Sequence, residues 1–203
     1  FEAKLSEGWP CWAFSNHDVR RVVTRWGGAN PSSRLANQLI ALLCSLRGSV
    51  CLYQGEELGL SEANVPFDSL RDPYGIAFWP NFRGRDGCRT PMPWNGDEHA
   101  GFSSVRPWLP VSAEHRAVNV EGQLTDRHSV LNSTRAFLHW RKRHPALRWG
   151  DIGFIDVPEP LLAFTRCCGG SRVFAAFNLS PEPRQADIEL PAGARQIDSV
   201  GIL

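Results

Sequence analysis

The stretch "NPSSRLANQLIALLCSLRGSVCLYQG" (residues 30–55) decides the fold, because an amphipathic helix in it runs directly into an apolar strand. Its leucines recur at the three- and four-residue steps of one helix face, namely Leu35, Leu39, Leu42, Leu43 and Leu46. Gly48 is expected to end the helix, and "SVCLYQG" (49–55) has the composition of a buried strand. Another apolar run, residues 10–16, precedes the helix. Strand, helix and strand in this order predict a βαβ unit with parallel strands.

The sequence changes character after Gly150. Short apolar runs follow at a spacing of roughly ten residues, which is typical of an all-β module: "IGFIDV" (152–157), "LLAFTR" (161–166), "RVFAAFN" (172–178), "ADIEL" (186–190) and "IDSVGI" (197–202). A further helix is expected near residues 129–144, with Pro145 ending it. We therefore predict an α/β part over residues 1–149 and an all-β part over residues 150–203.

Composition excludes several classes of function. The 203 residues carry a net charge of +1, which gives no electrostatic case for a nucleic-acid partner. The longest apolar run, "LIALLC" (39–44), is far shorter than the roughly 20 residues that cross a bilayer, so no membrane association is expected. None of the six cysteines forms a C-x-x-C pair, which favours a reducing, cytoplasmic location. The chain opens at Phe1 rather than methionine, so truncation at both ends is expected.

Polar side chains follow both predicted strands of the βαβ unit. Asn16, His17 and Asp18 come at the carboxyl end of the first strand, and "YQGEELG" (53–59) comes at that of the second. Functional groups of parallel α/β folds gather at this edge. Taken alone the pattern is weak, because Asp18 is also placed to cap a helix beginning at Val19. A metal-dependent HD phosphohydrolase is disfavoured, since no second cluster of metal ligands is present.

Four motifs in consistent order are much more specific than the His-Asp pair. They are "FSNHDVRRVVTRWG" (14–27), "YQGEELGL" (53–60), "DPYGIAFWPNF" (72–82) and "GRDGCRTPMPW" (84–94). Together they resemble glycoside hydrolase family 13, the α-amylase family, in its α-glucosidase and oligo-1,6-glucosidase branch. The resemblance implies the C-terminal part of a (β/α)8 TIM barrel (strands 7 and 8 with their helices) over residues 1–149. It also implies an incomplete antiparallel β-sandwich over residues 150–203.

The resemblance also implies roles for individual residues. Asp18 matches the family's third carboxylate, a transition-state stabiliser that accepts hydrogen bonds from sugar hydroxyls. His17 and Arg89 match residues that bind the same sugar. Arg21 is expected to position its loop, Glu57 to be structural, and Trp79 and Phe82 either to stack on a sugar or to fix the loop, as aromatic residues of long loops more often do. No cofactor or metal is expected.

The expected activity is retaining hydrolysis of terminal α-linked glucose from small α-glucosides or oligosaccharides. The alternatives are a transglucosidase or sucrose isomerase of the same family, a non-catalytic family member, or a truncated product without function. The family's nucleophilic aspartate and acid/base glutamate come from strands 4 and 5, which these motifs do not include. The isolated chain is therefore expected to be inactive.

Overall fold

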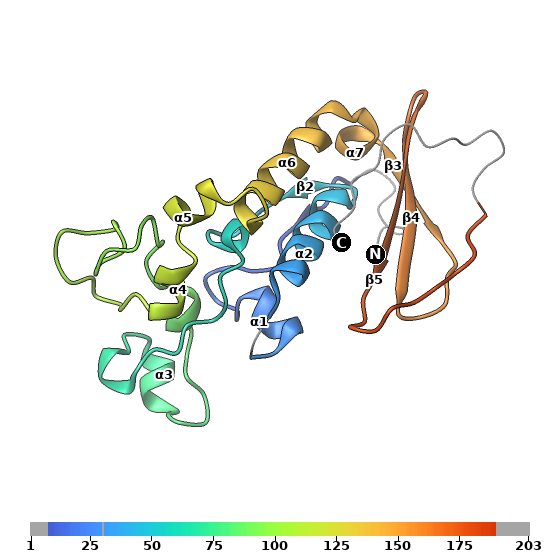
Figure 1. Ribbon diagram of the computed structural model, residues 1–203. Coiled ribbons are helices and arrows are strands. Elements are labelled where there is room, and N and C mark those ends of the chain that lie inside the picture. Colours follow the sequence, from blue (N-terminus) through green and yellow to red (C-terminus); the bar gives the residue numbers. More distant parts are fainter. Residues whose placement is uncertain (1–7, 30, 190–203) are drawn as a thin grey trace. The chain divides into compact units, whose positions relative to one another are not determined.

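A computed structural model describes residues 8–29 and 31–189 (Figure 1). Within this part, the chain forms two compact units. One gathers the residues up to Trp12, Ala41–Val50 and those from Phe137 onward, and the other gathers Ala13–Ile40 and Cys51–Ala136. This division differs from the boundary near residue 149, which marks a change from helices to strands along the sequence. The strand expected at residues 197–202 lies outside the described residues.

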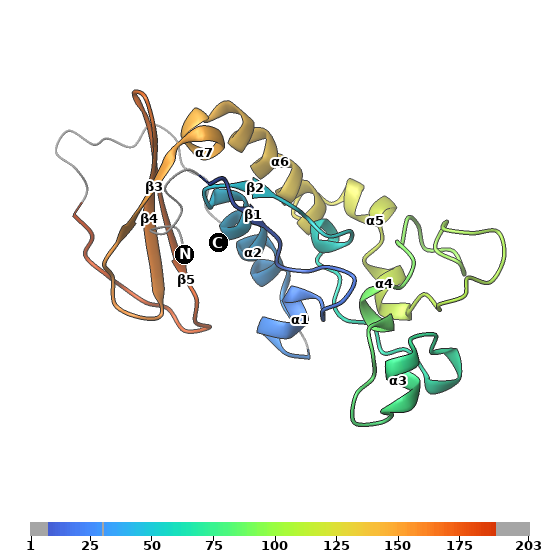
Figure 2. The same ribbon diagram turned by 180° about the vertical axis from the view of Figure 1, so that it is seen from behind.

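Two parallel strands confirm the predicted βαβ pattern. β1 (Cys11–Trp12) pairs with β2 (Ser49–Val50), and both strands are seen in Figure 2. The predicted strands, 10–16 and 49–55, were too long. Only two residues of each strand face a ladder partner, and an extended segment becomes a strand only where a neighbour takes up its backbone hydrogen bonds.

The two long helices lie close to their predicted positions. α2 (Ser33–Ser45) buries Leu39, Leu42 and Leu43, as the leucine spacing predicts. α6 (Val130–Arg143) ends in three cations at its carboxyl terminus, where the helix dipole favours positive charge. α7 (Pro145–Trp149) then begins with a proline at its first helical position.

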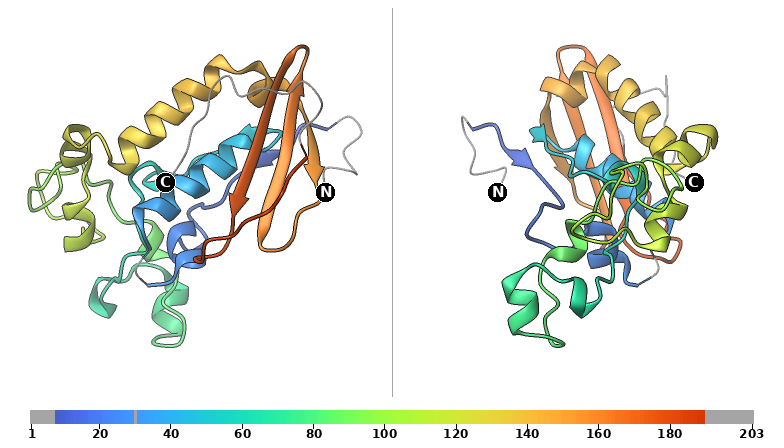
Figure 3. Two further views of the ribbon diagram at one scale, coloured as in Figure 1. Left: turned by 45° about the vertical axis from the view of Figure 1, so that its right-hand side comes forward. Right: turned by 90° about the vertical axis from the view of Figure 1, so that its left-hand side faces the viewer.

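Residues 151–178 form an antiparallel sheet in the order β3 (Asp151–Ile155), β4 (Leu161–Cys168), β5 (Ser171–Asn178). Its strands are the neighbouring orange and red arrows of Figure 3. The turn between β4 and β5 falls at Gly169 and Gly170, and the φ of 55° at Gly169 suits glycine. Three of the predicted strands are thus confirmed, while residues 186–189 of "ADIEL" are not a strand and have no ladder partner within the described residues. A sandwich needs a second sheet, so that part of the prediction stays a prediction.

Residues 51–128 are largely irregular. Short helices interrupt them, each begun by a side chain that accepts a backbone N–H hydrogen bond: α3 (Pro73–Ala77) by Asp72, α4 (Ala113–Ala117) by Ser112 and α5 (Val120–Thr125) by Asn119. A further short helix, α1 (Val22–Gly27), follows the NHD motif, and 3-10 turns cover Glu56–Leu58, Phe67–Ser69 and Asp86–Cys88. Among the described helices, none combines the length and the apolar character that a membrane crossing requires.

Candidate active site

Asp18 lies in the segment that joins β1 to α1. The Oδ1 atom of Asn16 accepts a hydrogen bond of 2.8 Å from the backbone N–H of Asp18, which folds the segment back on itself. Nearby, the buried hydroxyl of Ser15 accepts a bond of 2.9 Å from the N–H of Val22, at the start of α1. These two bonds close the segment onto the start of α1, while the side chain of Asp18 stays half exposed.

Three cationic or imidazole side chains surround the carboxylate of Asp18. Nη1 of Arg85 and Nη2 of Arg89 donate to Oδ1 at 3.0 and 2.9 Å. Nε2 of His17 lies 3.3 Å from Oδ2. Arg89 also donates from Nε to the backbone oxygen of His17 at 2.7 Å. The structure thus brings together the three residues proposed from the sequence, and it adds Arg85.

The pKa of Asp18 lies below its ordinary value. Partial desolvation acts to raise the pKa, but the hydrogen bond from Arg85 and the neighbouring charges of His17 and Arg85 outweigh it, with a further contribution from Arg89. Asp18 is therefore ionised at neutral pH. A carboxylate offers about four acceptor positions, and three are directed at protein groups here, so one is left for a ligand hydroxyl.

Arg85 is held by a buried carboxylate. Nε and Nη2 of Arg85 donate to the two oxygens of Asp72 at 2.9 and 2.8 Å, a two-pronged geometry that suits a guanidinium. The hydrogen bond from Arg85 lowers the pKa of Asp72 strongly and outweighs burial, which acts to raise it. Sequence reasoning missed Arg85, although it lies inside the motif "GRDGCRTPMPW" that carried the family resemblance.

Two Arg-Asp steps of the sequence, residues 71–72 and 85–86, are joined reciprocally. Asp72 accepts from the backbone N–H of Arg85 at 2.7 Å, and Asp86 accepts from the backbone N–H groups of Arg71 and Asp72 at 2.6 and 2.8 Å. Both carboxylates are buried. The motifs at 72–82 and 84–94 therefore form one hydrogen-bonded unit beside Asp18.

Arg21 is a buried structural residue, in agreement with its expected positioning role. Its side chain is 1% exposed and donates to the backbone oxygens of Gln54 at 2.7 Å and Cys88 at 3.1 Å. Its own N–H donates to Oε2 of Glu62 at 2.9 Å. Arg21 thereby ties the segment after β2 to the turn that precedes Arg89.

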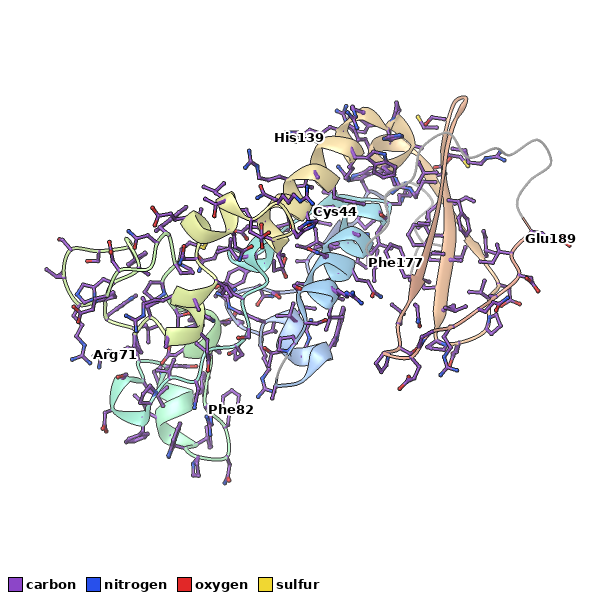
Figure 4. All side chains as sticks on the ribbon, in the orientation of Figure 1. Cys44, Arg71, Phe82, His139, Phe177 and Glu189 are labelled. Atoms are coloured by element: carbon purple, nitrogen blue, oxygen red, sulfur yellow. The ribbon has the colours of Figure 1, made fainter. Side chains whose placement is uncertain are left out.

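The remaining residues proposed from the sequence fall into structural positions or at the surface. Glu57 accepts a bond of 2.7 Å from the N–H of Gly55, which supports its structural interpretation. Trp79 packs on the core cluster of Val65, Leu70 and Leu109, so it fixes the loop. Phe82, labelled in Figure 4, is 48% exposed and is accessible to a ligand.

A cavity of about 930 Å³ extends from this site. Asp18 and Arg85 contribute to its wall, together with Glu62, Phe82 and His115. Burial raises the pKa of Glu62 and lowers that of His115, which favours the uncharged form of each group. The wall therefore combines the ionised carboxylate of Asp18 and the guanidinium of Arg85 with further hydrogen-bonding groups, an arrangement able to bind the hydroxyl groups of a ligand.

An ionised carboxylate bordered by hydrogen-bond donors is suited to binding the hydroxyl groups of a sugar. Residues 2–150 match the family model described as alpha amylase, catalytic domain. The chain therefore belongs to the α-amylase family, glycoside hydrolase family 13.

The curated relatives of this chain include proteins named as glucosidases. A probable alpha-glucosidase of Rhizobium meliloti (strain 1021) is 52% identical over 192 residues, covering 94% of this chain and 34% of the relative. An oligo-1,6-glucosidase of Parageobacillus thermoglucosidasius is 30% identical, covering 86% of this chain and 34% of that relative. The chain thus spans about a third of the length of these curated relatives.

Solved structures agree with this assignment. The structure of an alpha-glucosyl transfer enzyme, XgtA, is 62% identical with a TM-score of 0.91, covering 97% of this chain and 37% of that chain. An isomaltulose synthase from Erwinia rhapontici NX5 is 26% identical with a TM-score of 0.79, covering 89% of this chain and 36% of that chain. These likenesses support the family and leave the particular reaction to be tested.

Proposed function

We propose that this chain is the part of an α-glucosidase that supplies the transition-state stabiliser, Asp18, and the sugar-binding residues His17 and Arg89. The observation that carries the proposal is the ionised, half-exposed carboxylate of Asp18, held by two guanidinium groups and bordered by an imidazole. Positive charge develops on the sugar ring during glycoside cleavage, and a fixed carboxylate near the 2-hydroxyl stabilises that charge selectively.

Arg89 is suited to contact the terminal glucose. A guanidinium has five N–H donors, and Arg89 directs one to the backbone of His17 and one to Asp18. Its side chain is 28% exposed, so the remaining donors are accessible to hydroxyl oxygens of a sugar. His17, 69% exposed, borders the other oxygen of Asp18 and is placed to contact the same ring.

The reaction proposed is hydrolysis of terminal α-linked glucose with retention of configuration. Such a mechanism needs a nucleophile and an acid/base carboxyl group about 5 Å apart. The family resemblance assigns both to barrel strands that the motifs of this chain do not represent. We therefore propose that the isolated chain is inactive, that residues 1–149 belong to the barrel and residues 150–203 to a β-sandwich, and that the protein acts in the cytoplasm on small α-glucosides.

The test uses the complete natural protein that contains this chain, incubated with p-nitrophenyl α-glucoside and with maltose. Release of p-nitrophenol, with the α-anomer of glucose formed first by NMR, is the expected result. First formation of the β-anomer would contradict retention, and absence of turnover would contradict the glucosidase assignment. The 203-residue chain alone, prepared in a host without glucosidase, should give no turnover.

Glucosyl transfer is the second candidate, favoured by the 62% identity to an alpha-glucosyl transfer enzyme. The product mixture from maltose separates the two reactions. Glucose as the sole product supports hydrolysis, whereas longer glucosides, formed together with the glucose that each transfer releases from maltose, support transfer. Sucrose as substrate tests the isomerase alternative, for which rearranged disaccharides would be the evidence.

A further inference from the structure

Two arginines reach the same oxygen of Asp18, and the structure anchors them differently. Arg89 is anchored through a backbone oxygen of His17, a neighbour of Asp18 in the same segment. Arg85 is anchored through the side chain of Asp72, which is buried and 13 residues away along the chain. Arg85 therefore connects the Asp18 carboxylate to a part of the fold that is independent of the NHD segment.

Asp72 is itself fixed at every polar atom of its side chain. Oδ1 accepts from Arg85 and, at 3.3 Å, from the N–H of Tyr74, where it caps α3. Oδ2 accepts from Nε and from the backbone N–H of Arg85 at 2.9 and 2.7 Å. The ring of Tyr74 lies under the guanidinium of Arg85, with 5.4 Å from Cζ to the ring centre. The pair is therefore held in one geometry.

The backbone segments beside this pair are closely packed. A Cβ atom on Gly84 would lie 2.8 Å from Oδ2 of Asp72 and 2.8 Å from the nitrogen of Gly75, and the φ of Gly84 is +73°. A Cβ atom on Gly75 would lie 2.6 Å from the oxygen of Arg83. Glycine is needed at both positions, because α3 and the segment before Arg85 meet backbone to backbone.

We propose that Arg85, held by Asp72, is a positioning residue that sets the orientation of the Asp18 carboxylate. This inference rests on the proposed function of Asp18 as transition-state stabiliser. Nε and Nη2 of Arg85 both donate to Asp72. These two bonds fix the plane of the guanidinium and therefore the direction in which Nη1 meets Oδ1 of Asp18. A carboxylate held in this way needs no reorientation as charge develops on the sugar.

The test compares four variants of the complete natural protein. Arg85→Gln should lower kcat about 100-fold with KM changed little, the size expected when a reacting geometry is misplaced by about 1 Å. Arg85→Lys keeps the charge but lacks the fork, so it should recover only a small part of the loss. Asp72→Asn should resemble Arg85→Gln. Arg71→Gln is the matched control, because the exposed Arg71 side chain (Figure 4) also precedes an aspartate and its variant should keep the kcat of the unmodified protein.

A double-mutant cycle separates positioning from a merely structural effect. If Arg85 acts through Asp18, the change Arg85→Gln should cost about 100-fold alone and almost nothing further when Asp18→Asn is already present. Full additivity of the two losses would overturn the proposal. Full recovery of kcat in Arg85→Lys would also overturn it, because charge alone would then be sufficient.

A readout independent of turnover distinguishes failure of this inference from failure of the proposed function. Carbon NMR of the Asp18 carboxyl group should show a raised pKa in Arg85→Gln, since Arg85 is the leading influence that lowers it, while His17 and Arg89 remain. If the protein had no glucosidase activity but still showed this rise, the proposed function would be contradicted and the positioning role of Arg85 would be supported. An unchanged pKa of Asp18 in Arg85→Gln would contradict the positioning role of Arg85, whatever the activity of the protein.

Discussion

The irregular stretch of residues 51–128 and the sheet of residues 151–178 stabilise their backbones in opposite ways. In the sheet, three strands pair in continuous register, and Arg166 is the buried charged residue among its described positions. In the irregular stretch, buried Glu56, Asp72 and Asp86 accept hydrogen bonds from backbone N–H groups that no ladder satisfies. Single side chains should therefore matter much more in the irregular stretch than on the surface of the sheet.

The largest effect is expected from Asp18→Asn. The irregular stretch holds the carboxylate of Asp18 through Arg85 and Arg89. The substitution keeps the size of the side chain and removes its charge. We expect kcat/KM for an α-glucoside to fall roughly 100- to 1,000-fold, the range for loss of one preorganised electrostatic group, with an unchanged melting temperature. An unchanged kcat/KM would exclude Asp18 as the stabiliser.

Arg21→Met tests the claim that buried side chains replace a ladder in the irregular stretch. It removes two charge-assisted hydrogen bonds to the backbone oxygens of Gln54 and Cys88. The free energy of unfolding should fall by about 3 kcal/mol, measured by urea denaturation. Arg20→Met is the matched control, because Arg20 is exposed and its replacement should cost almost nothing. Equal losses at both positions would contradict the structural role of Arg21.

Arg89→Ala should affect recognition rather than folding, with an effect smaller than that of Asp18→Asn. The charge-assisted bond from Arg89 to Asp18 and its contacts to the glucose are worth about 2 kcal/mol together, so kcat/KM should fall about 30-fold. Steady-state kinetics and a thermal melt check this. If the melting temperature fell while kcat/KM of the folded protein stayed constant, Arg89 would be a bracing residue of its loop.

The smallest effect is expected on the sheet, from Phe154→Thr. Phe154 is 56% exposed and makes an edge-on contact with Phe164 on β4, with ring centres 5.9 Å apart. Loss of such a pair costs about 0.5–1.5 kcal/mol, and threonine keeps a strand-forming side chain. Activity should be unchanged. A loss of stability larger than that of Arg21→Met would reverse the contrast between the two regions.

The sequence predicted the regular elements well where periodicity was long. α2 and α6 follow the leucine and cation patterns to within a few residues, and three strands after Gly150 lie where the apolar runs indicated. The errors concern strands whose pairing neighbours the sequence does not identify. Residues 10–16, 49–55 and 186–190 have the composition of strands, but a strand also requires a neighbour, and composition does not reveal where neighbours end.

The candidate site was also predicted only in part, because motifs reveal single residues and do not reveal contacts between distant ones. His17, Asp18 and Arg89 were found through motifs whose order in the sequence is specific. Arg85 was missed because its importance comes from contact with Asp72 across an irregular loop, and such a contact leaves no periodic signal. The two Arg-Asp steps, at 71–72 and 85–86, were the available clue, but nothing in the sequence says which carboxylate binds which guanidinium.

The contact between Gly75 and Gly84 has a consequence for how this protein tolerates change. The two glycines close the base of the loop formed by residues 76–83, and Trp79 attaches that loop to the cluster of Val65, Leu70 and Leu109. Substitutions at exposed Phe78, which keep both glycines and Trp79, should leave the Asp72–Arg85 pair and the Asp18 carboxylate undisturbed. The exposed side of this loop is therefore a position at which the shape of the surface can be varied without changing the groups around Asp18.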